Sequence, residues 1–330
     1  MPGYTPTDIT YDSLLTTTLF NYRKQIIDNI FDVFPFLSWL NGKLGIAQRG
    51  STVKRVVDGG ESIVEHLLYA ANTTVNSYSG AELIDTTLQE GHTIARYNWK
   101  QYAGTVGITG LERRSNMGEA QLIALLQAKI SQLEMSFRNT MSEDAHATSS
   151  ANSGKDLTPI GLIVEGSDST VGSLSGGPTG TFTWWTAEET ASAGSFAATG
   201  LSKMRSMYNT LSFGNDKPDF CMTDQNVFEY YEKSLQPQER FTDNKVADAG
   251  FLNLTFKGIP IVFDRDCQSG TMYFLNSKYL SFVVHKDADM ATSPFVSPEN
   301  QDVTTSKMIW QGNLTTNNRR KLGKISGITA

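Results

Sequence analysis

The chain has 330 residues, of which 28 are Lys or Arg and 34 are Asp or Glu, so its formal net charge is −6. This acidity argues against a dedicated nucleic-acid-binding protein, whose domain would usually be basic. The first residues lack a secretory signal pattern, and no run of about 18 apolar residues could cross a bilayer. We therefore expect a protein without a membrane partner that is made in a cytoplasm.

The N-terminal region predicts one amphipathic helix. Apolar side chains recur at helical spacing within residues 14–40, and this pattern stops at Pro35. A cluster of aromatic and aliphatic residues follows at 36–40. So much apolar surface near a chain end needs a cover, either the body of the chain or a neighbouring subunit.

An acidic segment lies between two predicted strands at 52–57 and 96–110. Residues 58–95 contain six acidic residues and no Lys or Arg, which equals the net charge of the whole chain. In the second strand, the large side chains change from odd to even positions, which predicts a bulge near 100–102. The segment between has no helical pattern and little that could form a core, so we expect a long two-stranded arm.

The remaining chain predicts a mixture of helices and strands. The strongest helix spans 116–147, where apolar residues repeat every three or four positions. A Gly- and Ser-rich excursion at 165–181 and a polar loop at 236–249 interrupt the elements that follow. Further helices are expected at 197–211 and at 224–235, the latter with Asp224 as N-cap. Strands are expected at 161–164, 219–222, 258–263, 271–275, 280–284 and 303–314.

No catalytic or cofactor-binding pattern is recognisable. The histidines, His66, His92, His146 and His285, have no second ligand at metal-binding spacing. Asp264 and Asp266 could hold a divalent ion in principle, but turn-capping carboxylates are the favoured interpretation. The glycine-rich stretch 172–180 lacks the ending of a phosphate loop. Cys221 and Cys267 are interpreted as reduced, buried thiols. We expect no enzyme, no cofactor and no metal.

Several short segments, taken together, resemble the major capsid proteins of tailed bacteriophages. They are QEG at 89–91, YNWKQYA at 97–103, ITGLE at 108–112, NMG at 116–118, WQGNLTTNNRR at 310–320 and GKISGI at 323–328. The order of the expected elements matches that family along nearly the whole chain. The resemblance implies an α+β fold of the HK97 capsid type.

The resemblance also implies a division of the chain. Residues 1–50 would be the N-terminal arm, and 51–110 the extended loop with its flanking strands. Residues 111–157 and 291–330 would be the peripheral domain, with its spine helix at 116–147. Residues 158–290 would be the axial domain.

The function implied is self-assembly into hexamers and pentamers that form the icosahedral shell around double-stranded DNA. The protein would then reside in the virion capsid after assembly in the host cytoplasm. A separate scaffolding protein and a portal are the expected partners, a decoration protein is a further one, and contact with DNA should be weak and nonspecific. The loop has no lysine for an isopeptide crosslink, so we expect a noncovalent shell.

The expected contacts between subunits join acidic and aromatic residues of the loop to basic residues near the spine helix. They are Glu61, Glu65, Tyr69, Tyr78, Glu82, Asp85 and Glu90 of the loop, and Arg113, Arg114 and Arg138 near the helix.

Three alternatives remain open. An encapsulin nanocompartment shares the fold and would enclose cargo enzymes in place of a genome. A hydrolase or carbohydrate-binding module would be a monomer or small oligomer with a ligand pocket. A phage tail or decoration protein would form rings, tubes or surface trimers without closed shells.

Overall fold

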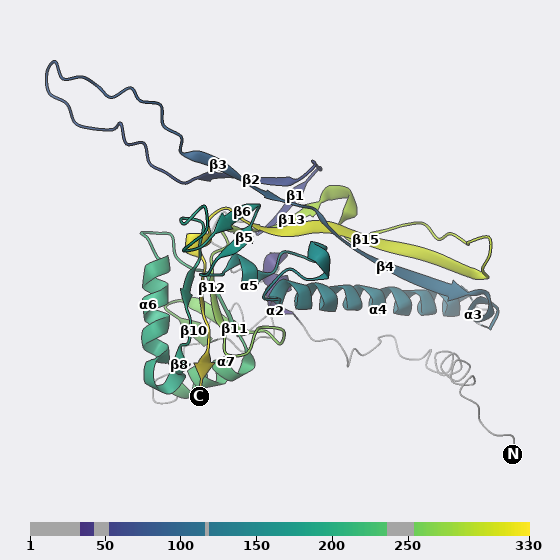
Figure 1. The fold of residues 1–330 in the computed structure, drawn as a ribbon. Helices are drawn as coiled ribbons and strands as arrows, with labels where there is room; N and C mark the ends of the chain where they lie inside the picture. Colours follow the sequence, from purple (N-terminus) through teal and green to yellow (C-terminus); the bar gives the residue numbers. More distant parts are fainter. Residues whose placement is uncertain (1–33, 43–52, 116–118, 236–253) are drawn as a thin grey trace. The chain divides into compact units, whose positions relative to one another are not determined.

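The longest helix and strand among the described residues are α4 (Glu119–His146) and β15 (Val303–Thr316) (Figure 1). The structure is a computed structural model that describes residues 34–42, 53–115, 119–235 and 254–330. These residues form two compact units. Unit 1 comprises the described parts of 101–141 and 287–311, and unit 2 those of 34–100, 142–286 and 312–330.

Unit 1 consists of a sheet and most of α4. Strand β15 pairs with β4 (Lys100–Thr109) and, antiparallel, with β14 (Ala291–Thr292). The short helix α3 (Gly110–Ser115) follows β4 directly. Gly104 lets β4 approach α4 closely, because a Cβ there would lie within 2.6 Å of the Leu133 and Phe137 side chains. The apolar face of α4 is thus covered by this sheet, as the helical spacing predicts.

Unit 2 contains a six-stranded sheet with helices α6 (Leu201–Leu211) and α7 (Gln225–Leu235). Both helices send apolar side chains into one core with the sheet, which includes Met204, Met207, Val227, Phe228, Tyr231, Ile261, Met272, Phe274 and Ile325. The strand order is β10 (Leu254–Phe256), β11 (Ile259–Phe263), β9 (Phe220–Thr223), β12 (Met272–Leu275), β16 (Gly323–Ile325) and β7 (Glu188–Thr190).

Smaller pairings complete unit 2. Strand β1 (Lys54–Val57) runs parallel to β13 (Leu280–His285), and β13 runs antiparallel to the end of β15. The other two-stranded pairs are β2 (Ile63–Leu68) with β3 (His92–Tyr97), β5 (Ser169–Val171) with β6 (Leu174–Gly176), and β8 (Gly194–Ser195) with β17 (Ile328–Thr329).

Short helical segments lie between these elements in both units. They are α2 (Pro35–Leu40), η2 (Asn152–Gly154), α5 (Ile160–Ile163), η3 (Phe196–Gly200), η4 (Lys286–Ala288) and η5 (Arg319–Lys321). None of the helices in the described part of the chain is both long and apolar enough to span a bilayer.

Most of the predicted elements are confirmed. The helix predicted at 116–147 is α4, and Asp224 caps α7 because its Oδ1 accepts the amide N–H of Val227 at 3.1 Å. The strands predicted at 52–57, 219–222, 258–263, 271–275, 280–284 and 303–314 are all present with slightly different ends. The loop predicted at 236–249 lies outside the described residues.

Two local predictions are wrong. Residues 161–164 form the helical turn α5 and not a strand. The long strand 96–110 is two strands, and its phase change marks the break at Asn98 and Trp99 where the chain leaves β2 to join β15. The helix predicted before Pro35 lies outside the described residues; Pro35 itself begins helix α2, since a proline at the first helical position loses no hydrogen bond.

The C-terminal residues differ from the expected division into domains. Strand β16 lies between β12 and β7 in the sheet of unit 2. Residues 312–330 therefore belong to a different unit from 291–311, with which they were grouped. The other expected domain bounds stay a prediction.

Candidate assembly surface

The acidic arm begins as a regular hairpin, which we call the root (β2 and β3). Six residue pairs join the strands, from Ile63 opposite Tyr97 to Leu68 opposite His92. Along β2 the side chains alternate strictly, with Ile63, Glu65 and Leu67 buried and the residues between them exposed. One face of the root is therefore packed against the rest of unit 2, as is usual for a half-buried strand.

Glu65 is part of this buried face. Its carboxylate forms an ion pair with Arg55 and accepts a hydrogen bond from Thr315 Oγ1 at 3.1 Å. Only 7% of Glu65 is exposed. This differs from the expectation that Glu65 contacts another subunit, because its charge is already paired within its own chain.

The hairpin β5–β6 also contacts the root, at strand β3. The amide of Arg96 donates to the carbonyl of Gly172 at 2.8 Å, and Ser173 Oγ donates to the carbonyl of Arg96 at 3.1 Å. At the end of the root, the ring of Tyr69 stacks on Trp184 with centroids 5.0 Å apart. Tyr69 thus fixes the end of the root within unit 2, although 40% of it stays exposed.

Residues 70–90, which we call the tip, have no helix or strand. Figure 1 shows this part of the chain as an open loop beyond the ends of β2 and β3. Its hydrogen bonds are local, such as Asn72 Oδ1 with Thr74 and Asp85 Oδ1 with Thr87. The bonds from Thr87 hold the pKa of Asp85 below its ordinary value, so this carboxylate is ionised at neutral pH.

The tip exposes large apolar side chains. More than half of the large hydrophobic residues exposed in the described part of the chain lie between residues 64 and 88. In the tip itself they are Val75 at 79%, Tyr78 at 65%, Leu83 at 100%, Ile84 at 63% and Leu88 at 96%. Only Tyr78 was among the expected contacts. The others follow no period, so no sequence pattern distinguished them from residues that fold inward.

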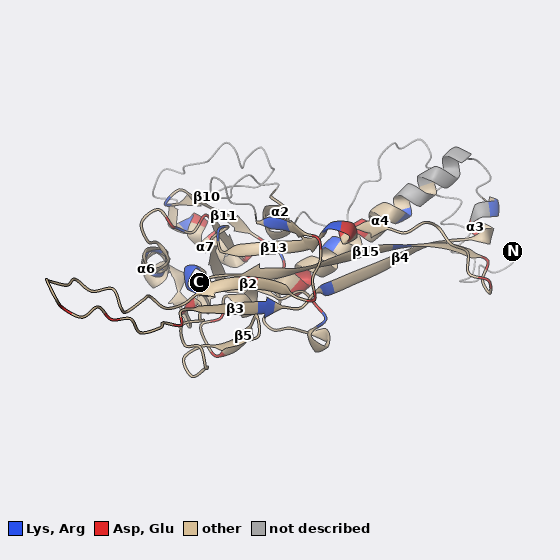
Figure 2. Cartoon of the chain, turned by 90° about the horizontal axis from the view of Figure 1, so that it is seen from above, with Lys and Arg blue, Asp and Glu red and all other residues tan. Residues whose placement is uncertain are grey.

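The same segment is acidic, as Figure 2 shows by red and no blue along the loop. The expected contacts Glu82, Asp85 and Glu90 are all exposed there, and Glu61 is exposed just before the root. Glu82 makes a local bond with the amide of Ser79, and none of these four carboxylates has an ion pair among the described residues. The tip combines apolar groups with unpaired negative charge.

The basic candidates differ from one another. Arg114 forms an ion pair with Asp302 at 2.7 Å, and both side chains are about two-thirds exposed. Arg138 lies exposed on α4 with no ion pair among the described residues. The side chain of Arg113 is outside the described residues. Of the two candidates whose side chains the structure describes, Arg138 is therefore the more available to an acidic partner.

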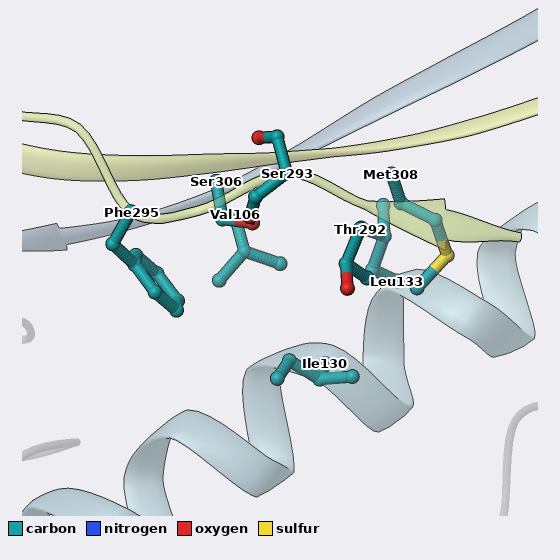
Figure 3. Close-up of a pocket in the computed structure, with 8 residues that line it drawn as sticks. All are labelled: Val106, Ile130, Leu133, Thr292, Ser293, Phe295, Ser306 and Met308. Atoms are coloured by element: carbon teal, nitrogen blue, oxygen red, sulfur yellow. The ribbon is translucent and has the colours of Figure 1, made fainter.

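A small pocket of about 80 Å³ lies within unit 1 (Figure 3). The described residues that line it include no acid, base or nucleophilic thiol. They come from the sheet and from α4, and are Val106, Ile130, Leu133, Thr292, Ser293, Phe295, Ser306 and Met308. Such a lining offers apolar contact and no proton-transfer chemistry.

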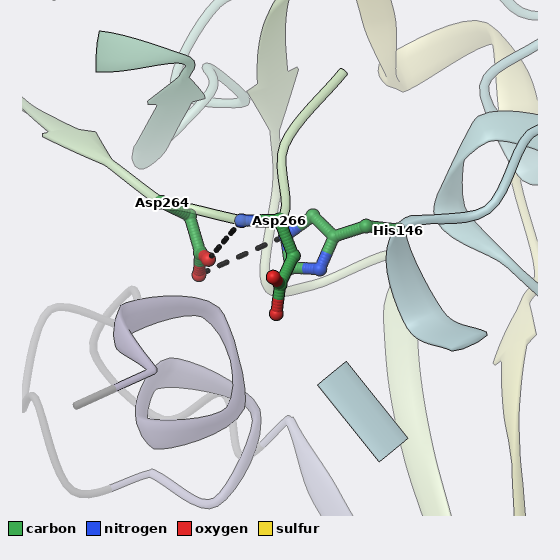
Figure 4. Close-up of side chains that lie close together, drawn as sticks. All are labelled: His146, Asp264 and Asp266. Atoms are coloured by element: carbon green, nitrogen blue, oxygen red, sulfur yellow. Dashed lines mark hydrogen bonds and ion pairs between the residues drawn. The ribbon is translucent and has the colours of Figure 1, made fainter. Parts of the chain in front are cut away.

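One cluster in unit 2 could hold a metal ion. The structure brings His146 to Asp264 and Asp266, whose ligand atoms lie within 4.8 Å of one another (Figure 4). The expected turn-capping role of Asp264 is confirmed, since its Oδ1 accepts the amide N–H of Asp266 at 3.2 Å. The proximity of His146 could not be seen from spacing, because more than a hundred residues separate it from Asp264.

Solved structures of capsid and compartment shells share this fold. The chain superposes on the capsid of cyanophage A-1(L) with a TM-score of 0.67 and 16% identity, covering 93% of this chain and 96% of that one. The capsid of Myoviridae phage XM1 gives a TM-score of 0.56 and 12% identity, covering 99% of this chain and 100% of that one. The SrpI encapsulin of Synechococcus elongatus PCC 7942 gives a TM-score of 0.55 and 8% identity, covering 95% of each chain.

No protein-family model and no curated protein sequence matches the chain. The likeness is thus structural, and it extends over more than nine-tenths of each compared chain. The order of elements along the sequence and the three-dimensional arrangement agree: this chain has the α+β HK97-type fold of tailed-phage capsid proteins.

Proposed function

We propose that this chain is a major capsid protein that assembles into hexamers and pentamers of an icosahedral shell around double-stranded DNA. Its role is structural and involves no catalysis. The mature protein resides in the virion capsid, and the shell is assembled in the host cytoplasm. The fold shared with phage capsids supports this proposal over nearly the full length of the chain.

The observation that carries the proposal is the exposed tip of the arm. Leu83 and Leu88 are almost fully exposed, and a soluble monomer rarely keeps several large apolar groups in water. The tip has no regular structure of its own to cover them. A second copy of the chain supplies a cover, since closed symmetry presents the same receiving surface to every subunit.

The rigid root defines how the tip is presented. Glu65, Tyr97 and Tyr69 tie the root to unit 2 through an ion pair, hydrogen bonds and ring stacking. The tip then contacts surface of a neighbouring subunit that lies beyond the compact part of its own chain, and this contact adds to the buried area of the interface. A stable interface of this kind buries about 1,200–2,000 Å² in total.

Charge selects the receiving surface. Glu61, Glu82, Asp85 and Glu90 attract basic residues of a neighbouring subunit, and Tyr69 and Tyr78 add aromatic contact. The receiving side uses Arg138 first, because Arg114 is already paired with Asp302. We include Arg113 with them on its position in α3 alone.

The remaining partners follow from the same proposal. A separate scaffolding protein directs assembly, a portal occupies one vertex, and a decoration protein could bind the outer surface. The shell is noncovalent, because the segment 58–95 has no lysine for a crosslink. Contact with packaged DNA is weak and nonspecific, as the net charge of −6 gives little attraction to phosphate.

The experiment compares the full chain with two tip variants by size-exclusion chromatography and electron microscopy. Thr73 Oγ1 and Gln89 Oε1 lie 3.0 Å apart, so a short glycine linker can replace residues 74–88 without straining the root. The second variant keeps the length and replaces 74–88 with Gly and Ser. Circular dichroism and thermal unfolding verify that each variant folds.

Closed shells or hexamer sheets from the full chain, together with folded but unassembled variants, would support the proposal. A full chain that stays monomeric at high concentration with scaffold supplied would contradict it. The SrpI encapsulin structure keeps one alternative in view. Shells purified from the native source that contain protein cargo and no DNA would establish a nanocompartment instead.

A further inference from the structure

The cluster of His146, Asp264 and Asp266 joins two segments of unit 2. His146 is the last residue of α4, and the two aspartates follow the end of β11. His146 Nε2 lies 3.7 Å from Asp264 Oδ2, and Figure 4 shows the imidazole facing both carboxylates. The side chains of His146 and Asp264 are 1% and 0% exposed.

The hydrogen bonds of His146 determine which ring nitrogen is available. Nδ1 lies 2.8 Å from the carbonyl oxygen of Ser142, which can only accept, so Nδ1 carries the proton. In the neutral ring, Nε2 then presents a lone pair. Its neighbours are Met222 Sδ at 3.3 Å and Asp264 Oδ2 at 3.7 Å, both electron-rich. In this tautomer a buried lone pair is aimed at other electron donors, and a proton or a metal cation between them would be favourable.

The charge of the cluster indicates which cation fits. Asp264 accepts amide N–H groups from Phe36 at 3.1 Å and Asp266 at 3.2 Å, and no Lys or Arg contacts it among the described residues. A proton on His146 would leave two carboxylates facing one positive charge. A divalent ion balances both carboxylates with a neutral imidazole, which removes the cost of an uncompensated buried charge.

We propose that His146 Nε2, Asp264 and Asp266 bind one divalent first-row transition-metal ion, with Zn²⁺ as its representative. One imidazole with two carboxylates suits this class, whereas Ca²⁺ and Mg²⁺ prefer oxygen ligands alone. The Nδ1–H bond to a backbone carbonyl is the usual support of a metal-bound histidine. Ser142 Oγ orients Asp266 in the same way by donating to Oδ2 at 2.6 Å.

The bound ion would fasten three segments at one point. It ties the end of α4 to the turn after β11, and Asp264 also holds the start of α2 through the amide of Phe36. Asp266 is only partly buried, so we infer that the ion would enter on its side of the cluster. The metal would therefore stabilise unit 2 in every subunit of a shell, independently of the arm.

The test measures Zn²⁺ uptake by the full chain after treatment with a chelator, using equilibrium dialysis and elemental analysis. We expect one ion per wild-type chain. Asp266→Asn keeps the shape and an acceptor for Ser142, and should weaken Zn²⁺ affinity about 10-fold or more. Asp58→Asn, at an acid whose side chain is 85% exposed, is the matched control and should bind like wild type.

A Co²⁺ spectrum of the wild-type chain tests coordination without any variant. Visible bands of a low-symmetry site with a nitrogen ligand, absent in His146→Gln, would support the proposal. Folded wild type that takes up no Zn²⁺, or uptake that neither Asp266→Asn nor His146→Gln reduces, would overturn it. The cluster would then be a buried ion pair of protonated His146 with Asp264.

Discussion

Two regions of the molecule hold groups in unfavourable surroundings. The tip of the arm exposes apolar side chains to water, and the C-terminal part of the chain buries the charged side chain of Arg319. Arg319 is 0% exposed and makes five hydrogen bonds, which go to four backbone carbonyls and one hydroxyl. The acceptors belong to Leu162, Ile163, Glu165, Ser169 and Trp185.

The difference between the two regions lies in where their partners are. Burial lowers the pKa of Arg319 to about 10, so it stays charged at neutral pH, but its own chain supplies every acceptor that it uses. Leu83 and Leu88 have no such partners within the described chain. The Arg319 region is complete in one subunit, whereas we propose that assembly completes the tip.

Arg319→Met gives the largest expected effect on folding. Its removal takes away the printed donor of the buried Ile163 and Trp185 carbonyls and leaves the Glu165 carbonyl with the Ala187 amide alone, and each buried group left without a donor costs about 1–3 kcal/mol. We expect a loss of about 3–5 kcal/mol in the free energy of unfolding, measured by urea denaturation. Arg320→Met, at the exposed neighbouring residue, is the control. Equal stability of both variants would show that the buried cation is dispensable.

Gly172→Ala tests the packing of the hairpin β5–β6 against the root of the arm. Gly172 has φ +62, and a Cβ there would lie 2.7 Å from Ala95 Cβ and 3.0 Å from the Tyr97 ring. We expect the free energy of unfolding to fall by about 1–3 kcal/mol, with the root displaced from β5–β6. Gly214→Ala, at φ +59 in open space, is the control for the backbone cost alone. If both lose the same amount, the close packing of the root contributes nothing.

Lowering the pH should reduce the free energy of unfolding, in part through protonation of Glu165. Burial alone would raise the pKa of Glu165, but hydrogen bonds from Lys324 and Ser167 bring it below its ordinary value of 4.5. A lowered folded-state pKa contributes stability above pH 4.5 that is lost as the pH falls through the folded value.

The effect should be below about 1 kcal/mol, because Glu165 is partly exposed. Denaturant unfolding of Glu165→Gln between pH 6 and pH 3 should show a flatter loss of stability than wild type. Glu61→Gln, at an exposed acid, should follow the wild-type curve. A Glu165→Gln curve parallel to wild type would contradict the assignment.

The elements that sequence predicted well have one-sided burial. The apolar stripe of α4, with Phe137 buried and Arg138 exposed, leaves a period that can be read without a structure. The acidity of the arm was equally visible, since charge needs no fold to be counted. Short apolar runs were not decisive, because Ile160–Ile163 fits a strand and a helical turn equally well.

Tertiary contacts account for what sequence could not show. Glu65 lies on the buried face of β2 because Arg55 and Thr315 meet it there, and this interrupts the apolar alternation that would reveal the strand. Likewise, His146 meets Asp264 only after α4 and β11 come together. The expected interface residues could be taken from charge, whereas the exposed leucines of the tip required the fold.

The double variant Leu83→Ser and Leu88→Ser has the smallest expected effect on folding and separates the two regions most directly. Both side chains are 96% exposed or more, so the free energy of unfolding of the isolated chain should change by less than about 0.5 kcal/mol. Assembly should nevertheless weaken, since burying a leucine at an interface contributes about 1.5–3 kcal/mol. Light scattering against protein concentration measures the shift.

Phe213→Ser is the matched control, because Phe213 is 80% exposed outside the arm. It should assemble at the wild-type concentration. If the control and the double variant shift assembly equally, surface hydrophobicity in general drives association and the tip has no special role. If only the double variant raises the concentration needed, the apolar tip is a contact that one chain leaves open and a second chain closes.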